Sequence, residues 1–89
     1  MPDHQALVAL ATLPTGTCGT IARLSGGPAF VGRLAGMGIT VGANLRVLQN
    51  TGRGPLLIRV RETRLAIGRG EALRVLMRAS DEAGLHART

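Results

Sequence analysis

The stretch that decides the fold of this 89-residue chain is PAFVGRLAGMGI, residues 28–39. Within it Phe30, Leu34 and Met37 recur at i, i+4 and i+7, which is the apolar stripe of a helix of about three turns. This period of 3.6 residues occurs between segments that have a different period. We therefore predict one short helix at this point in the chain, with Phe30 as its anchor in the core.

Both ends of this predicted helix carry recognisable signals. Pro28 suits the first helical position, where its missing N–H would have no partner in any case. Gly38 is placed to end the helix in the left-handed conformation, with Ile39 folding back over the last turn. Gly32 and Gly36 each cost about 1 kcal/mol relative to alanine inside a helix. Packing, and not intrinsic propensity, must therefore hold this helix in place.

On either side of the helix, apolar residues alternate with polar ones, which is typical of half-buried strands. The alternation predicts four short strands, at residues 44–49, 56–61, 64–67 and 73–78, and the apolar anchors Ile21 and Leu24 after Gly16 and Gly19 predict a first strand at residues 18–24. A small open sheet of this kind would expose unpaired strand edges, and closure into a barrel removes them. We therefore predict a mainly β fold, a small barrel of about five strands with one short helix inserted after the first strand.

Two turns of the predicted barrel differ in quality. Residues 50–55, NTGRGP, are suited to a flexible hairpin tip between the second and third strands. A two-residue turn at Glu62 and Thr63 requires a positive φ, which glutamate adopts only at a cost of about 1 kcal/mol. We expect residues 1–79 to form the single domain and residues 80–89 to form a polar tail.

Length and cysteine content exclude several classes of protein. A chain of 9.2 kDa has room for one domain and not for a two-domain enzyme. The lone Cys18 can complete neither an intramolecular disulfide nor a thiolate zinc site, which fits a reducing compartment. The longest apolar run, residues 6–11, is far shorter than the roughly 20 residues of a membrane-spanning helix. We therefore expect a cytoplasmic protein without a transmembrane segment.

The charge of the chain comes from eleven arginines and no lysine against five carboxylates, a formal net charge of +6. Such a balance suits an acidic partner, whether nucleic acid, an anionic membrane surface or an acidic protein patch. The arginines occur singly and mostly alternate with apolar residues, so they also suit the solvated outer face of a sheet. Small barrels bind single strands by stacking bases on aromatic side chains. Phe30 is the only aromatic residue, so we expect no specific nucleic-acid binding.

The sequence contains no recognisable set of catalytic residues and few possible metal ligands. Both histidines, His4 and His86, lie in the expected tails, and no phosphate-binding glycine motif is present, so we predict neither an enzyme nor a bound cofactor. Glu82 and His86 are spaced i, i+4, and Asp3 with His4 adds two donors at the other end. Two ligands do not make a site, but two chains could assemble four. We therefore predict no tight native metal site, and these four residues are candidates only for an inter-chain zinc site. A homodimer, if formed, would be weak or metal-mediated.

At several positions the chain resembles the FeoA family of small ferrous iron transport proteins. The resemblance extends from about Leu10 to Arg78 and rests on the segments L-x-x-L-x-x-G-x-x-G-x-I (10–21), G-G (26–27), R-L-x-x-M-G-I-x-x-G (33–42), G-P-x-x-I-x-V (54–60), L-A-I (65–67) and A-x-x-V-x-M (72–77). The segment R-L-x-x-M-G-I is the most specific. Val41 departs from the family pattern, which often has proline there, and Glu62 stands where glycine is usual.

The resemblance implies an SH3-like barrel with its helix after the first strand. It also implies a non-enzymatic cytosolic accessory protein of bacterial ferrous iron uptake, acting on the cytoplasmic part of FeoB, a membrane permease with a GTP-binding domain. Two alternatives remain: a polyanion-binding barrel, and a stand-alone relative of the SH3-like module at the C-terminus of DtxR-type iron repressors. The candidate partner surface is the outer side of the helix together with an arginine stripe: Gly32, Arg33, Gly36, Arg59, Arg61 and Arg64.

Overall fold

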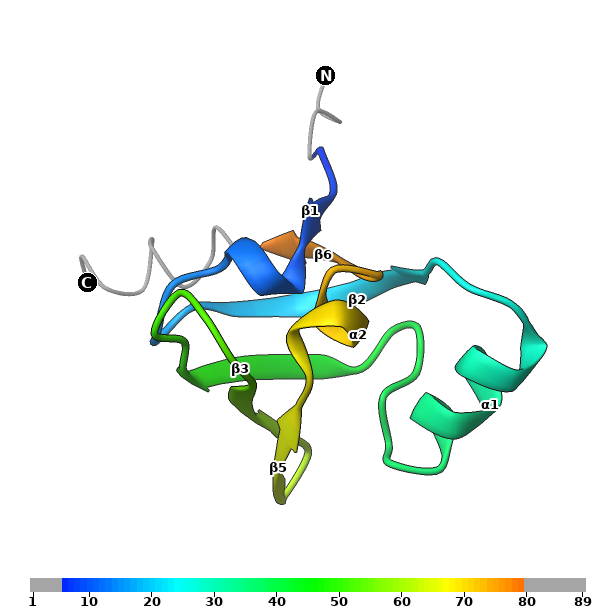
Figure 1. The fold of residues 1–89 in the computed structure, drawn as a ribbon. Helices are drawn as coiled ribbons and strands as arrows, with labels where there is room; N and C mark the ends of the chain where they lie inside the picture. The colour runs from blue at the N-terminus through cyan, green and yellow to red at the C-terminus, as the bar shows by residue number, and fades with distance from the viewer. Residues whose placement is uncertain (1–5, 80–89) are drawn as a thin grey trace.

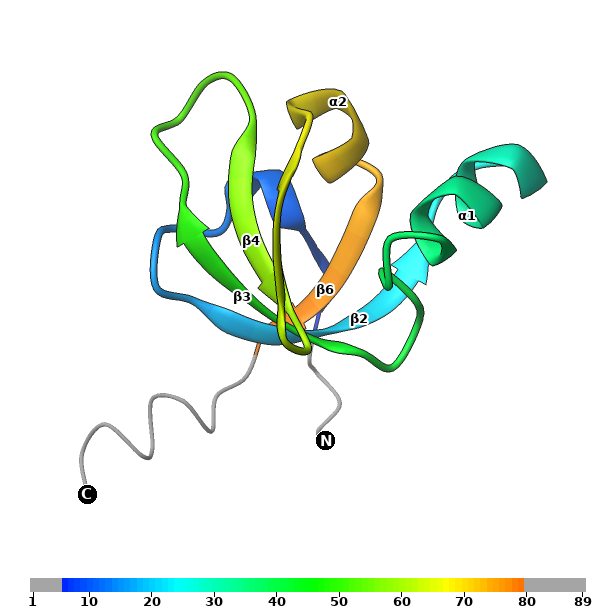
Figure 2. The same ribbon diagram turned by 90° about the horizontal axis from the view of Figure 1, so that it is seen from below.

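The computed structural model describes residues 6–79, which form one six-stranded antiparallel sheet curled around a core (Figures 1 and 2). Neighbouring strands follow the order β1-β6-β2-β3-β4-β5. The elements are β1 Val8–Ala9, η2 Leu10–Thr12, β2 Cys18–Leu24, α1 Pro28–Ala35, β3 Asn44–Gln49, β4 Leu56–Val60, β5 Thr63–Ile67, α2 Arg69–Ala72 and β6 Val75–Ala79. The prediction of a mainly β, barrel-like fold is confirmed.

Strict alternation along the strands builds the core. In β3 and β4 the buried apolar residues alternate with half-buried or exposed ones, so one face of each strand lines the core and the other carries one exposed arginine, Arg46 in β3 and Arg59 in β4. All the fully buried side chains of the described residues are apolar; the largest are Leu10, Ile21, Leu34, Ile39, Val47, Leu56, Ile58, Val60, Ile67, Val75 and Met77. The core therefore lies inside the curled sheet, and the arginines lie outside it.

The middle of the sheet depends on a close approach at Gly19. A Cβ atom there would lie 2.9 Å from the carbonyl oxygen of Arg78 and 3.1 Å from Cε of Met77, both on the neighbouring strand β6. The register of β2 against β6 also shifts between Ile21 and Arg23. Irregularities of this kind increase the local twist, which helps a short sheet to curl.

The helix α1 has the predicted ends. Pro28 occupies its first turn, and Gly38 has a φ of 87°. The N–H of Ile39 donates to the carbonyl of Leu34 at 2.9 Å, and the N–H of Gly38 donates to the carbonyl of Ala35 at 2.9 Å. These two bonds are the Schellman arrangement, and the side chain of Ile39 is fully buried beneath it. The helix itself has eight residues, one turn fewer than predicted.

Three elements were absent from the sequence-based prediction. The strand β1 pairs with β6, so the sheet has six strands and α1 follows the second of them. The 3-10 turn η2 comes directly after β1. The one-turn helix α2, Arg69–Ala72, lies between β5 and β6, and its last turn runs through Leu73 and Arg74. The last strand therefore begins at Val75 and not at residue 73.

Side chains, and not strand pairing, close the barrel between its two edges. No hydrogen bonds join β1 to β5 within residues 6–79; α2 and η2 lie between them (Figure 2). The guanidinium of Arg69 donates to the carbonyls of Gly54 at 3.0 Å and Ala11 at 3.1 Å, and to Oδ1 of Asn50 at 2.7 Å. Nδ2 of Asn50 donates to the carbonyls of Ala11 and Leu13 at 3.0 and 2.8 Å. This Asn50–Arg69 clasp joins η2, the β3–β4 loop and α2.

The turn between β4 and β5 lies one residue earlier than expected. Val60 pairs with Thr63, so Arg61 and Glu62 form the two-residue connection. The positive φ that we assigned to Glu62 falls on Arg61, whose φ is 59°. A non-glycine residue in this conformation is uncommon and costs roughly 1–2 kcal/mol. The prediction that a non-glycine residue of this turn has a positive φ is therefore correct, but the residue is Arg61 and not Glu62.

Candidate binding surface

Strand register brings three arginines side by side on the outer face of the sheet. Arg46 of β3 pairs with Arg59 of β4, and Arg59 pairs in turn with Arg64 of β5. All three side chains are exposed. On the fourth strand of the same row, Cys18 of β2 pairs with Arg46. We call Arg46, Arg59 and Arg64 the arginine row.

A groove of about 520 Å³ lies beside two members of the arginine row, Arg46 and Arg59. Arg46, Arg59 and Arg61 contribute its charged wall, and β2 contributes Cys18 and Thr20. Oγ1 of Thr20 lies 3.2 Å from Oδ1 of Asn44, so hydroxyl and amide groups face the groove beside the arginines. The groove therefore offers hydrogen-bonding groups and positive charge together.

Little within residues 6–79 neutralises this face. Ten arginines stand against two carboxylates there, Glu62 and Glu71. Glu62 approaches Arg59 at 3.9 Å, but its side chain is 93% exposed, so this pair contributes at most a few tenths of a kcal/mol. Like charges directly opposite each other on neighbouring strands are destabilising. The arginine row therefore lowers the stability of the sheet that carries it.

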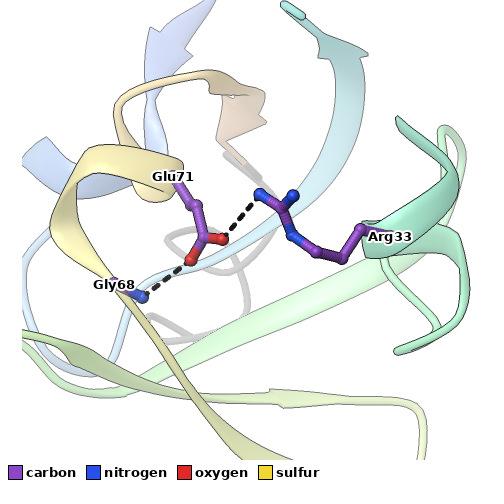
Figure 3. A network of polar contacts seen from close by, with 3 residues as sticks. All are labelled: Arg33, Gly68 and Glu71. Carbon is purple, nitrogen blue, oxygen red and sulfur yellow. Dashed lines mark hydrogen bonds and ion pairs between the residues drawn. The ribbon is translucent and has the colours of Figure 1, made fainter. Parts of the chain in front are cut away.

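The helical part of the predicted partner surface lies elsewhere. Arg33 reaches from α1 to α2, where its Nη2 donates to Oε2 of Glu71 at 3.0 Å (Figure 3). The other carboxylate oxygen of Glu71 accepts the backbone N–H of Gly68 at 3.3 Å. The guanidinium of Arg33 also lies 5.8 Å from the centre of the Phe30 ring, and that of Arg74 lies 5.4 Å from it. Arg33 thus helps to fix α1 against the body of the protein.

The six residues of the predicted surface therefore form two separate groups. Gly32 and Gly36 are exposed on α1, and a Cβ at Gly32 would meet no atom within 4 Å. Arg59, Arg61 and Arg64 lie on the β4–β5 hairpin, away from α1 (Figures 1 and 2). Sequence reasoning omitted Arg46 from the stripe, although its position in an alternating strand had marked it as outward-facing. Only the register of β3 against β4 places it beside Arg59.

The predicted metal ligands, Asp3, His4, Glu82 and His86, lie outside the described residues, so the inter-chain zinc site stays a prediction. Within residues 6–79, no three His, Cys, Asp or Glu side chains gather as a metal site would require. In that same part of the chain, no helix has the length and apolar character needed to span a membrane.

Comparisons with known proteins place this fold. The FeoA domain model matches residues 8–79. A candidate Fe(2+) transport protein A of Methanocaldococcus jannaschii is 31% identical over 64 residues, which are 72% of this chain and 77% of that protein. A crystal structure of an iron uptake regulatory protein, FeoA, superposes with a TM-score of 0.79 at 36% identity, over 83% of this chain and 99% of that one.

Two further structures show how widely the architecture is shared. FeoA of Stenotrophomonas maltophilia, described as a prokaryotic SH3 domain protein and solved with zinc, has a TM-score of 0.66 at 29% identity, over 79% of this chain and 88% of that one. A manganese-dependent transcriptional repressor matches with a TM-score of 0.75 over 89% of this chain but 42% of its own; at 24% identity this is a likeness of fold alone. Since the family match spans every described strand and helix, the chain belongs to the FeoA domain family.

Proposed function

We propose that this protein is a cytoplasmic accessory protein of ferrous iron uptake, which acts by binding the cytoplasmic part of a FeoB-type GTP-binding permease. The observation that carries the proposal is the family match over residues 8–79. The name of the relative from M. jannaschii, which refers to Fe(2+) transport, supports it. The proposed role is that of a binding protein; neither catalysis nor a resident cofactor is part of it.

Such a protein changes the behaviour of its partner only through a difference in affinity between the partner's states. The decisive experiment is therefore a calorimetric titration of this chain into the permease's purified cytoplasmic domain, loaded with GTP in one series and with GDP in another. We expect binding, with different affinities for the two forms. Equal affinities would leave a regulatory role without a driving force, and no binding to either form would reject the proposal.

The alternative with a specific observation in its favour is polyanion binding, because residues 6–79 contain ten arginines and only two carboxylates. Salt dependence separates the two functions. Binding to nucleic acid weakens steeply with salt, since each neutralised phosphate releases a counterion. Binding to the permease domain that persists at moderate salt, together with loss of oligonucleotide binding there, would favour the permease.

The fold likeness to the manganese-dependent repressor does not raise the other alternative above these two. In that protein the matched region is less than half of the chain. A shared barrel is compatible with many functions, so it carries no regulatory activity over to this chain.

A further inference from the structure

The arginine row has a structural cost that a solvated surface does not require. Arg59 lies directly opposite Arg46 on one side and Arg64 on the other, so the middle strand carries two like-charge pairs in register. Threonine, an uncharged residue that is favoured in strands, would keep the same outer face polar without this repulsion. Within residues 6–79, the carboxylate that approaches the row is Glu62, which lies 3.9 Å from Arg59 and is 93% exposed, so it relieves little of this repulsion. Carboxylates of a bound partner would relieve the repulsion among the three arginines.

Arginine is suited to carboxylates in particular. Its planar guanidinium can form two parallel hydrogen bonds to one carboxylate, and such charge-assisted pairs are stronger than neutral hydrogen bonds. Exposed aromatic rings, on which nucleobases would stack, are missing from this face: the single aromatic residue, Phe30, is 6% exposed and belongs to α1. The chemistry of the face therefore favours an acidic protein segment over a single-stranded nucleic acid.

The spacing of the row indicates the conformation of that segment. Neighbouring strands lie about 4.8 Å apart, so the backbone positions from which Arg46, Arg59 and Arg64 extend are spaced at about that interval. Side chains at i and i+3 or i+4 of a helix are about 5–6 Å apart. Same-face side chains of an extended strand are about 6.6 Å apart, two residues at about 3.3 Å each. An acidic helix lying across the strands matches the row more closely than an extended peptide.

The geometry points to the arginine row, with Arg61 beside it, as the docking surface for an acidic helix of the protein partner. One turn of that helix would supply a carboxylate to Arg46, the next to Arg59 and the third to Arg64. The groove beside the row, with Thr20 and Asn44 in its lining, would receive polar side chains from the flank of the same helix. This inference rests on the proposed function, since it assigns the surface by which this chain would bind the permease's cytoplasmic domain.

The test compares two double variants of equal charge. R46T/R59T removes two members of the row, and R23T/R53T removes two exposed arginines outside it, on β2 and in the β3–β4 loop. Threonine is well accepted on exposed strand positions, and Arg53 lies in an exposed loop, so both variants should fold; circular dichroism and thermal melting check this. For the permease domain we expect R46T/R59T to raise Kd by about tenfold or more, and R23T/R53T by less than about threefold.

Equal losses of affinity in the two variants would overturn the inference, because only net charge would then matter. Unchanged affinity in R46T/R59T would overturn it as well, and in both cases the proposed function would stand. A second arm uses a synthetic helical peptide with glutamate at i, i+4 and i+7, and the same peptide with glutamine at those positions.

The second arm separates the surface from the identity of the partner. If the wild-type chain does not bind the permease domain, the proposed function fails, and the peptide still decides the inference. Binding of the glutamate peptide that R46T/R59T loses and R23T/R53T keeps would support the row as an acidic-helix site. No preference over the glutamine peptide would overturn it. Row-dependent binding to vesicles containing phosphatidylglycerol, without binding to the peptide or the domain, would assign the surface to a membrane and overturn the inference too.

Discussion

At the scale of single residues, Phe30, the only aromatic side chain in the chain, anchors α1 in the core. The residue is 6% exposed, and the guanidinium groups of Arg33 and Arg74 lie over its ring. Phe30→Ala should lower the free energy of unfolding by about 3–5 kcal/mol, a large part of the stability of a domain this small. Urea denaturation followed by circular dichroism measures this loss.

The control for this change is Phe30→Leu, which keeps most of the apolar volume and should cost less than about 1.5 kcal/mol. A loss below about 1 kcal/mol in Phe30→Ala would show that α1 is not anchored through this ring.

Asn50 is the second residue on which the fold depends, for a polar reason. Its amide donates to the carbonyls of Ala11 and Leu13, and its oxygen accepts from the backbone N–H of Gly52 and from Arg69. Asn50→Ala would remove these four hydrogen bonds and leave the partly buried carbonyl of Leu13 without its donor, although the carbonyl of Ala11 keeps Arg69, and should cost about 1–3 kcal/mol. Asn50→Asp should also destabilise, since it places a carboxylate against two carbonyl oxygens in place of the donor. Thermal unfolding of both variants tests this, and an Asp variant as stable as wild type would contradict the assigned donor role.

At the scale of elements, the arginine row links stability to binding. Arg59→Thr would remove both like-charge pairs of the row at once, whereas Arg53→Thr removes an equal charge from the β3–β4 loop. At low salt we expect Arg59→Thr to raise the free energy of unfolding by about 0.5–1 kcal/mol and Arg53→Thr to change it by less than about 0.5 kcal/mol. Denaturant midpoints compare the two directly. A destabilised Arg59→Thr would mean that the arginine stem packs on its neighbours more than its charge repels them.

The sequence predicted the elements whose patterns are long enough to repeat. The strand at 44–49 was placed to the residue because Leu45 and Val47 alternate with Arg46 along it. The strand at 18–24 was also placed to the residue, from its apolar anchors Ile21 and Leu24 and the glycines at its entry. The strand β1 has two residues and the helix α2 has four, each too short to show a period. Their positions are fixed by tertiary contacts, such as those of Arg69, that join residues up to 58 positions apart.

The same limit applies to the candidate site. Alternation correctly predicted that Arg59 and Arg64 face outward, but it does not predict which residues of neighbouring strands lie opposite each other. Arg46 joins the row only through the register of β3 and β4, which shifts between Val47 and Gln49. Arg33 suited a free surface by sequence, whereas in the structure it is paired with Glu71 on an element that the sequence did not reveal.

At the scale of the whole molecule, charge acts in opposite directions on folding and on binding. Ten arginines and two carboxylates within residues 6–79 make the compact state repel itself. The same excess of positive charge raises the affinity for an acidic partner, because binding of that partner relieves the repulsion. Added salt screens both interactions, because the Debye length falls from about 30 Å at 0.01 M to about 10 Å at 0.1 M.

We therefore expect opposite salt dependences for stability and for binding of an acidic partner. Between these two salt concentrations the melting temperature of the free protein should rise, since screening weakens repulsion among the arginines. The affinity for the glutamate peptide should fall over the same range, which appears as a larger Kd. In R46T/R59T the melting temperature and Kd should both change less with salt, because the row supplies much of the repulsion and much of the attraction to the peptide. R23T/R53T keeps the row, so its melting temperature and Kd should respond to salt more nearly as in the wild type. Differential scanning calorimetry and titration of the same samples make the comparison. A wild-type melting temperature that falls with added salt would show that attractive pairs, such as Arg33 with Glu71, outweigh the repulsion, and that the arginine row imposes no strain for a partner to relieve.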